Sequence, residues 1–258
     1  MKFSVVIPVL NERACLPATV ASVRIGIPEA EIIACDGGST DGSREWLLAQ
    51  RDVTVLDSPR GKGPQQNAAA ARAHGDVFLF LHADSQLPSD AKQRLERALS
   101  NTCNVGGCFF VRFAERTPLS LRILAFGMNI RAVLLKRCFG DHALFIRRAV
   151  FEHVGGFPEW PLFEDYELVR RMKRAGRFGV IPSPVTISAR RFLERGVWRT
   201  VMLVFLLQTG FYLGVSPARL KRWFADIRPH LRQTAKERLN LGEFDGTATT
   251  TGKRSTGT

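Results

Sequence analysis

Cysteine is scarce in this chain and is not arranged for cross-linking. The 258 residues include five cysteines, an odd number without a C-x-x-C pair: Cys15, Cys35, Cys103, Cys108 and Cys138. This pattern argues against a disulfide framework and against a zinc-binding ribbon. No signal peptide precedes the first strand-like segment, so we expect a cytoplasmic protein whose thiols stay reduced.

Two common nucleotide-binding motifs are absent as well. No G-x-G-x-x-G follows a strand-like run, which excludes an NAD-binding Rossmann site, and no G-x-x-x-x-G-K-[ST] marks a P-loop. The nearest feature is the basic segment Arg60-Gly-Lys-Gly, which opens an Ala-rich helix. Backbone amides at that helix start could bind phosphate, with positive charge from Arg60 or Lys62. A solvated basic turn explains the same residues.

The chain also lacks internal repeats and a Pro/Ser-rich linker, and its length suffices for one sizeable core. Strand-like apolar runs alternate with helical stretches at 14–24, 43–50, 64–74 and 88–100. This alternation predicts an α/β protein with a single Rossmann-like, mostly parallel central sheet flanked by helices. Later segments predict a strand at 106–113 and an amphipathic helix at 118–135. We expect a main domain at 1–195, an apolar and basic helical extension at 196–242, and a disordered Thr- and Gly-rich tail at 243–258.

Polar residues follow three of the predicted strands. The first strand ends at Pro8, shortly before Glu12, the second ends at Asp36, and the apolar run 76–83 leads to Asp84. Ligands of open α/β sheets bind outside the carboxyl ends of the strands, so we expect these side chains at one edge of the sheet. Ordinary loop and cap residues explain each segment separately, but they explain the coincidence of all three less well.

Four motifs, taken in order, resemble those of family 2 glycosyltransferases of the GT-A fold. They are Val5-Val6-Ile7-Pro8 with Asn11-Glu12, Asp36-Gly-Gly-Ser-Thr-Asp41-Gly, His82-Ala-Asp84 and Glu164-Asp165. The likeness extends from residue 3 to residue 190, which is most of the chain. Two departures, Asp36-Gly37 in place of adjacent aspartates and His82-Ala-Asp84 in place of Asp-x-Asp, are similar to a small subgroup of soluble members, some linked to arsenosugar biosynthesis.

The resemblance implies an inverting transfer of a sugar from a nucleoside-diphosphate sugar, of the UDP or GDP type, to an acceptor hydroxyl. Asp165 matches the catalytic base. Asp84 matches the residue that binds Mg²⁺ or Mn²⁺ at the diphosphate, and one carboxylate suffices if phosphates and water complete the octahedron. The donor contacts we expect are Pro8, Glu12, Asp36, Lys62, Asp84 and Arg191. The acceptor contacts we expect are Asp141, His142 and Glu164.

Several structural explanations compete with these roles. Glu164 and Asp165 open a predicted helix that ends before Gly176, and acidic residues in a first turn suit the helix dipole regardless of function. His82 could bind the metal through its imidazole or could only shape its loop. A lone histidine such as His142 is more often structural than catalytic.

Two other functions compete with glycosyl transfer. A GT-A-like nucleotidyltransferase would use residues 60–63 as its phosphate loop, but such enzymes usually carry a Gly-rich loop directly after the first strand. A non-catalytic, membrane-associated GT-A module would not need both Asp84 and Asp165, which this chain retains.

Acidic residues are too few to balance the basic ones. The chain has 37 Lys and Arg against 24 Asp and Glu, a net charge of +13. An anionic donor needs a positive cleft but not this excess, and no nucleic-acid-binding motif accompanies the charge, so we expect no nucleic-acid partner. The apolar segment 197–215, flanked by arginines, could pack in the core or in a homodimer, or lie on the inner face of the membrane. A membrane span is the least favoured reading, because spanning needs ~20 apolar residues and this segment contains Arg199 and Gln208.

Overall fold

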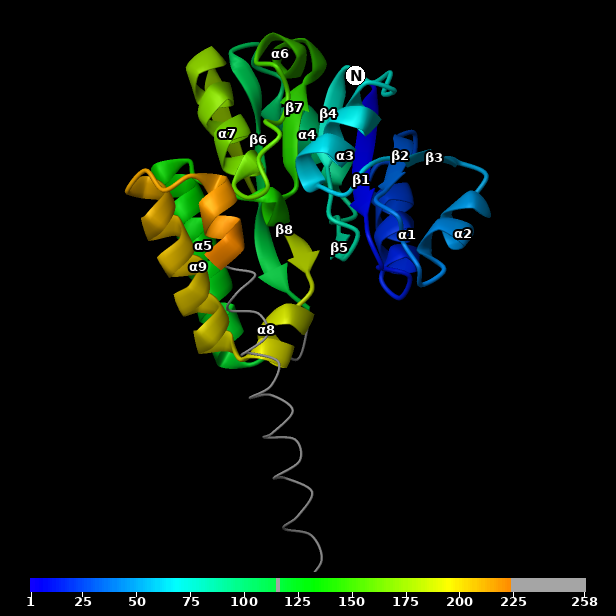
Figure 1. Cartoon of the computed structure of the whole chain (residues 1–258). Helices are drawn as coiled ribbons and strands as arrows, with labels where there is room; N and C mark the ends of the chain where they lie inside the picture. The colour runs from blue at the N-terminus through cyan, green and yellow to red at the C-terminus, as the bar shows by residue number, and fades with distance from the viewer. Residues whose placement is uncertain (115–116, 224–258) are drawn as a thin grey trace, which may run out of the picture. The chain divides into compact units, whose positions relative to one another are not determined.

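The computed structural model of the protein describes residues 1–114 and 117–223 (Figure 1). The chain divides into two compact units, Met1–Ala189 and Arg190–Thr258. The predicted tail at 243–258, and the part of the predicted extension beyond residue 223, lie outside the described residues.

The first unit is built on one eight-stranded sheet with the strand order β3-β2-β1-β4-β7-β6-β8-β5. Its strands are β1 Phe3–Val9, β2 Glu31–Asp36, β3 Val53–Asp57, β4 Val77–Phe80, β5 Ser85–Gln86, β6 Asn104–Phe113, β7 Leu144–Arg147 and β8 Arg177–Ile187. The pairs β1–β2, β2–β3, β1–β4 and β6–β8 are parallel, whereas β4–β7, β6–β7 and β5–β8 are antiparallel. The predicted α/β class is confirmed, with antiparallel β7 inserted between the two parallel groups.

Six helices of the first unit lie where the sequence predicts them, to within a few residues, whereas α6 is not predicted. The helices of this unit are α1 Leu16–Gly26, α2 Ser43–Leu48, α3 Lys62–Ala70, α4 Ala91–Ala98, α5 Leu119–Leu135, α6 Arg148–His153 and α7 Glu164–Ala175, with a 3-10 turn η1 at Gly140–His142. The sequence does not predict β8, because Pro182 and Pro184 lie inside it. Its pairing with β6 passes from Ile181 directly to Pro184, so the intervening residues form a bulge that accommodates the prolines.

Pro8 lies inside β1, although the sequence predicts that ladder pairing ends there. Leu81 donates its N–H to the Val6 carbonyl, so Val6 and Pro8 both face β4. The pairing with β4 ends at Val6, so Pro8, which has no N–H, leaves no bond of this ladder unmade. Pairing with β2 continues to Val9. The prediction is therefore right for one neighbour of β1 and wrong for the other.

An aromatic cluster fixes the segment that leads to α7. Phe80 of β4 lies edge-on to Phe157 with 4.8 Å between ring centroids, and Phe78 lies edge-on to Phe151 of α6 at 5.4 Å. These rings are nearly or fully buried. Edge-to-face pairs add roughly 0.5–1.5 kcal/mol beyond the burial of apolar area. The cluster therefore ties the 154–158 loop, and with it the start of α7, to a central strand.

The second unit contains α8 Arg190–Arg195 and α9 Val197–Tyr212. In α9 only Leu207 is buried, whereas Trp198, Phe205 and Leu206 are more than half exposed. Among the described residues, no helix combines the length and the hydropathy needed to cross a membrane.

Candidate functional site

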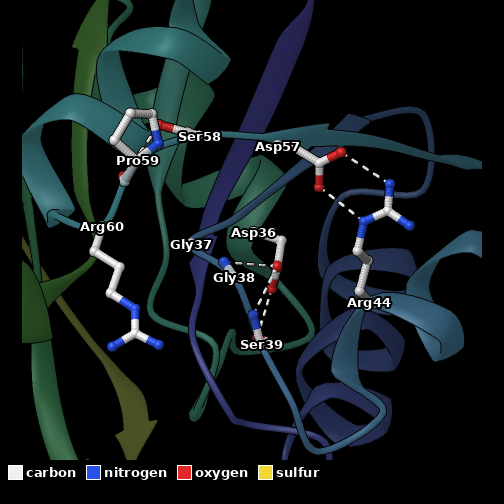
Figure 2. A pocket seen from close by; sticks show the side chains of 9 residues that line it. All are labelled: Asp36, Gly37, Gly38, Ser39, Arg44, Asp57, Ser58, Pro59 and Arg60. Atoms are coloured by element: carbon white, nitrogen blue, oxygen red, sulfur yellow. Dashed lines mark hydrogen bonds and ion pairs between the residues drawn. The ribbon is translucent and has the colours of Figure 1, made fainter.

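A cavity of about 650 Å³ lies at the carboxyl ends of β2 and β3 (Figure 2). It is lined by residues 36–39, residues 57–60 and Arg44. Parallel strands bring these loops to one edge of the sheet, which is where open α/β folds bind their ligands.

Asp36 shapes the wall of this cavity. Its Oδ2 accepts hydrogen bonds from the N–H groups of Gly38 and Ser39, both at 2.9 Å, and its Oδ1 accepts the Ser39 hydroxyl at 2.5 Å. Gly38 has φ +85°, in the left-handed region that favours glycine. Asp36, one of the expected donor contacts, thus lies at the cavity, but its carboxylate accepts these three hydrogen bonds from its own loop.

Two arginines border the cavity, and they differ in their contacts with acidic side chains. Arg44 donates two hydrogen bonds of 2.8 Å to the carboxylate of Asp57, and this pairing lowers the pKa of Asp57. Arg60 makes no hydrogen bond or ion pair with another described residue. Figure 2 shows its guanidinium on the side of the cavity away from the Arg44–Asp57 pair. Arg60 is therefore the cation available to an anionic ligand.

The loop after β1 is bound to the loop after β2. Asn11, at φ +55°, donates its N–H to the Ser39 hydroxyl at 2.9 Å and accepts the N–H of Thr40 on its Oδ1 at 2.8 Å. The N–H of Glu12 donates to Ser43 Oγ at 3.0 Å. The structure therefore brings two of the predicted motifs together, with Glu12 partly exposed on the joined loops.

A chain of three side chains links α3, the segment after β4 and η1. Lys62 Nζ lies 3.3 Å from His82 Nε2, and His82 Nδ1 lies 3.0 Å from Asp141 Oδ1. An ammonium group only donates, so Nε2 accepts a hydrogen bond from Lys62 and Nδ1–H donates one to Asp141. His82 is buried, while the Asp141 side chain is 43% exposed. Both ring nitrogens are engaged, which favours the loop-shaping role of His82 over metal binding.

Asp165 is held by two backbone amides at the start of α7. Gly140 of η1 donates its N–H to Asp165 Oδ2 at 2.5 Å, and the N–H of Tyr166 donates to Oδ1 at 2.7 Å. Phe163, the residue before the first residue of α7, has φ +64°, which is rare for a bulky side chain. Such strained residues persist where the surrounding structure fixes them, and they cluster at functional sites.

Glu164 has a different environment from its neighbour. It is buried, whereas Asp165 is partly exposed. Burial raises the pKa of Glu164 to about 7; the charges of Asp165 and Asp141 also raise it, and Lys62 opposes them. Two adjacent carboxyl groups with separate environments are typical of sites in which one carries a proton and the other accepts one.

Two glycines allow the elements of this cluster to approach one another. A Cβ on Gly63 of α3 would lie 2.8 Å from the Pro158 carbonyl oxygen, and one on Gly140 would lie 2.6 Å from His82 Nε2. Both distances are too short for a real Cβ contact. The starts of α3, η1 and α7 therefore converge only because these positions carry no side chain.

Asp84 lies in the turn between β4 and β5 and is partly exposed. The turn is closed by a hydrogen bond from Ser85 N–H to the His82 carbonyl at 3.0 Å, and Thr19 of α1 donates its hydroxyl to the Ala83 carbonyl at 2.8 Å. Among the described residues, no group of three or more His, Cys, Asp or Glu side chains is arranged to hold a metal ion. A single carboxylate suits a hard cation whose other ligands come from phosphate and water.

A sequence model of glycosyl transferase family 2 matches residues 4–155, more than half of the chain. The chain belongs to glycosyl transferase family 2. This family 2 enzyme is 33% identical over 196 residues to the succinoglycan biosynthesis protein ExoA of Rhizobium meliloti, covering 67% of this chain and 58% of the relative. It is 30% identical over 160 residues to an undecaprenyl-phosphate 4-deoxy-4-formamido-L-arabinose transferase of Photorhabdus laumondii, covering 57% of this chain and 48% of the relative. The chain thus spans about half of the length of these curated relatives.

Solved structures confirm the predicted GT-A type fold. Residues 1–349 of TarS from S. aureus, in complex with UDP, align with a TM-score of 0.60 at 17% identity, covering 73% of this chain and 60% of that one. The mannosyltransferase PcManGT of Pyrobaculum calidifontis, in complex with GDP-Man and Mn²⁺, aligns with a TM-score of 0.60 at 19% identity, covering 96% of this chain and 76% of that one.

Six of the ten predicted site residues of this glycosyltransferase fall into two groups. Glu12 and Asp36 lie on the two joined loops, of which the second lines the cavity. Lys62, Asp141, Glu164 and Asp165 lie near the start of α7. Outside the groups, Pro8 is buried in β1 and Asp84 lies in the turn after β4. His142 is fully buried, and its Nδ1 is 2.9 Å from the Phe109 carbonyl, so the ring has no exposed surface for an acceptor. Arg191 belongs to α8, and its side chain lies outside the described residues.

The sequence analysis did not identify two residues of α3, Gln65 and Asn67, whose side-chain amides join separate segments of the site. Gln65 Nε2 donates to the carbonyls of Val9 and Cys35 at 2.9 and 2.8 Å, which joins the ends of β1 and β2. Asn67 exchanges two hydrogen bonds of 2.8 and 3.0 Å with the backbone of Phe157. Their one signal in the sequence is their position in an Ala-rich helix directly after the basic 60–63 segment.

Proposed function

We propose that this family 2 enzyme transfers a sugar, with inversion, from a nucleoside-diphosphate sugar to an acceptor hydroxyl. The observation that carries the proposal is Asp165, a partly exposed carboxylate fixed by two backbone N–H groups beside the Lys62–His82–Asp141 chain. A carboxylate within hydrogen-bond reach of the acceptor can take its proton while the hydroxyl attacks the anomeric carbon. Asp141 and Glu164 lie near Asp165, where they would contact the acceptor.

In this proposal the cavity at β2 and β3 receives the nucleoside diphosphate. Glycines at 37 and 38 let a ligand approach the backbone closely, and Arg60 and Lys62 supply positive charge for the phosphates. The negative charge that grows on the leaving diphosphate needs cations in fixed positions. UDP complexes of TarS and the GDP-Man complex of PcManGT support a donor of this class but do not select between the two bases.

A divalent cation, Mg²⁺ or Mn²⁺, belongs to the proposal, with Asp84 as the protein ligand. When bound, it would neutralise charge on the donor diphosphate. The Mn²⁺ in the PcManGT complex supports this assignment, as does the oxygen chemistry of Asp84. We also propose a cytoplasmic location, and the exposed apolar side chains of α9 support a membrane or dimer contact for residues 197–215.

Product analysis with purified protein tests the reaction. Incubation with UDP- and GDP-sugars and Mn²⁺ should release the nucleoside diphosphate, with or without an added acceptor. A parallel incubation with nucleoside triphosphates and sugar 1-phosphates should release no inorganic pyrophosphate; its release there would instead identify a nucleotidyltransferase. Full activity in excess EDTA would contradict the metal role, and Asp84→Ala should fold normally but lose metal-dependent nucleotide affinity in calorimetry.

The base assignment has its own test. Asp165→Asn keeps the shape of the side chain but cannot accept a proton, so kcat should fall by roughly 10²–10⁴-fold. Donor affinity should be retained, because Asp165 is proposed to face the acceptor. Loss of donor binding with unchanged kcat at saturation would place Asp165 in the donor site.

A further inference from the structure

Helix α5 carries a row of large apolar side chains on its outer face. Leu119, Ile123, Phe126, Ile130 and Leu134 follow one another at intervals of three or four residues, so they lie along one side of the helix. Leu119, Phe126 and Leu134 are 67%, 66% and 74% exposed. We call these five residues the α5 stripe. Contiguous exposed apolar surface of this kind marks an interaction site in soluble proteins.

The inner face of the helix has smaller side chains. Its buried residues are Leu121, Ala125 and Ala132. Asn129 accepts the N–H of Val111 at 2.8 Å and donates to the Val111 carbonyl at 2.9 Å, so β6 holds the helix in one rotation. The α5 stripe therefore cannot turn inward without breaking both bonds.

The surroundings of the α5 stripe are basic. No Asp or Glu occurs between Thr117 and Gly140. Arg122 is exposed on the helix, and Lys173 of α7 donates to the Leu135 carbonyl at the carboxyl end of the helix at 3.2 Å. Lys136 and Arg137 follow directly. Apolar side chains bordered by cations are the chemistry of a helix that lies in an anionic lipid interface.

We propose that α5 is a membrane-binding helix that inserts its apolar stripe into the surface of an anionic bilayer. A second copy of the chain is the less suitable occupant. A twofold contact places the same surface on both partners, so the cations around the stripe would face one another with no acidic residue of the helix to offset them. The inference concerns binding and does not rest on the proposed transfer reaction.

Vesicle flotation tests this inference with variants of matched exposure. The test variant is Ile123→Ser/Phe126→Ser/Ile130→Ser. The control is Ile25→Ser/Leu48→Ser, which changes side chains that are 64% and 56% exposed on α1 and α2. Wild type and control should float with phosphatidylcholine–phosphatidylglycerol vesicles, less so at high salt, since salt screens the charge contribution. The test variant should bind at least tenfold more weakly.

The results of these experiments distinguish a bilayer from a second copy of the chain as the partner of the α5 stripe. Thermal unfolding should give similar midpoints for all three proteins, because the changed side chains are exposed. If the test variant unfolds early, Phe126→Trp replaces it, and the added fluorescence should shift to the blue with anionic vesicles and not with phosphatidylcholine alone. Absence of wild-type flotation, or equal flotation of the test variant, overturns the proposal. A dimer that the test variant converts to monomer assigns the stripe to a second copy.

Discussion

At the scale of single residues, His82 connects the two halves of the candidate site. The asparagine of His82→Asn can still donate a hydrogen bond to Asp141 from near the position of Nδ1, but its side chain does not reach Lys62. We expect this variant mainly to raise the KM for the nucleoside-diphosphate sugar. His82→Gln keeps a polar atom near Nε2 but loses the bond to Asp141, whose neighbour Gly140 holds Asp165, so we expect it mainly to lower kcat.

Each effect should be roughly ten- to a hundredfold, the range for a hydrogen bond to a charged group. Steady-state kinetics with varied donor concentration measures the two constants separately. If both variants change the same constant by the same factor, His82 has only a general structural role.

The raised pKa of Glu164 predicts that the stability of the fold depends on pH. This pKa is about 7 in the folded chain and 4.5 ordinarily, so the folded state binds a proton that the unfolded state has released between those values. The free energy of unfolding should therefore fall as pH rises from 4.5 to about 7, by on the order of 3 kcal/mol from this group.

Glu164→Gln has no ionisable group at this position, so its free energy of unfolding should not fall with rising pH through this residue. The variant should be more stable than wild type at pH 8, while the two proteins differ less at pH 5. Urea unfolding at both pH values checks this, with Glu152→Gln on an exposed surface of α6 as the control. An identical pH slope in wild type and Glu164→Gln would contradict the assignment.

The sequence was informative about residues whose role depends on their neighbours in the chain. Asp36 and Asp165 stand in short local motifs; Asp36 lines the cavity at the carboxyl end of β2, and Asp165 lies in the first turn of α7. Gln65 and Asn67 could not be found in this way, because their partners are backbone carbonyls and amides of distant segments. The burial of His142 likewise depends on how η1 packs against β6.

At the scale of elements, close approach of α3 to the loop before α7 is a testable requirement. Gly63→Ala would place a methyl group 2.8 Å from the Pro158 carbonyl oxygen. We expect it to cost about 1–3 kcal/mol of stability, as overpacking does, and to lower activity, because the start of α7 carries Asp165. Gly127→Ala is the matched control: apart from its own helix backbone and chain neighbours, no atom of the described residues lies within 4 Å of its Cβ position.

In a helix interior, the control change should stabilise by about 0.5–1 kcal/mol. Urea unfolding of both variants gives the two free energies. Equal stability of Gly63→Ala and wild type would show that α3 can move away from Pro158.

Elements with local signals were predictable and those with long-range causes were not. Helices α5 and α7 follow from apolar spacing and from Gly176 after Ala175. Strand β8 depends on a bulge opposite β6 that accommodates two prolines, and antiparallel β7 depends on which strands it meets. The residue pattern of one strand does not reveal which other strand will pair with it and stabilise it.

At the scale of the whole molecule, α9 repeats the pattern of α5 within its own unit. Trp198, Met202 and Phe205 are exposed, and Leu207 is buried. Trp198→Ser/Met202→Ser/Phe205→Ser should keep the unfolding midpoint of wild type and weaken vesicle flotation or dimer formation, whichever wild type shows in flotation and light scattering. Leu207→Ser should lower the midpoint instead. Equal destabilisation by both would show that α9 packs inside the fold.

The antiparallel pairing of β4 with β7 has a consequence for engineering. On one side of this seam lie β1, β2 and β3 with the cavity, and on the other lie β6 and β8 with the chain segments that carry Asp141 and Asp165. The seam is short, and among the described side chains the Lys62–His82–Asp141 bonds bridge the segments on its two sides. Chimaeras that exchange the part after β5 should change acceptor choice and keep the donor, provided that the incoming chain supplies an acidic residue for His82.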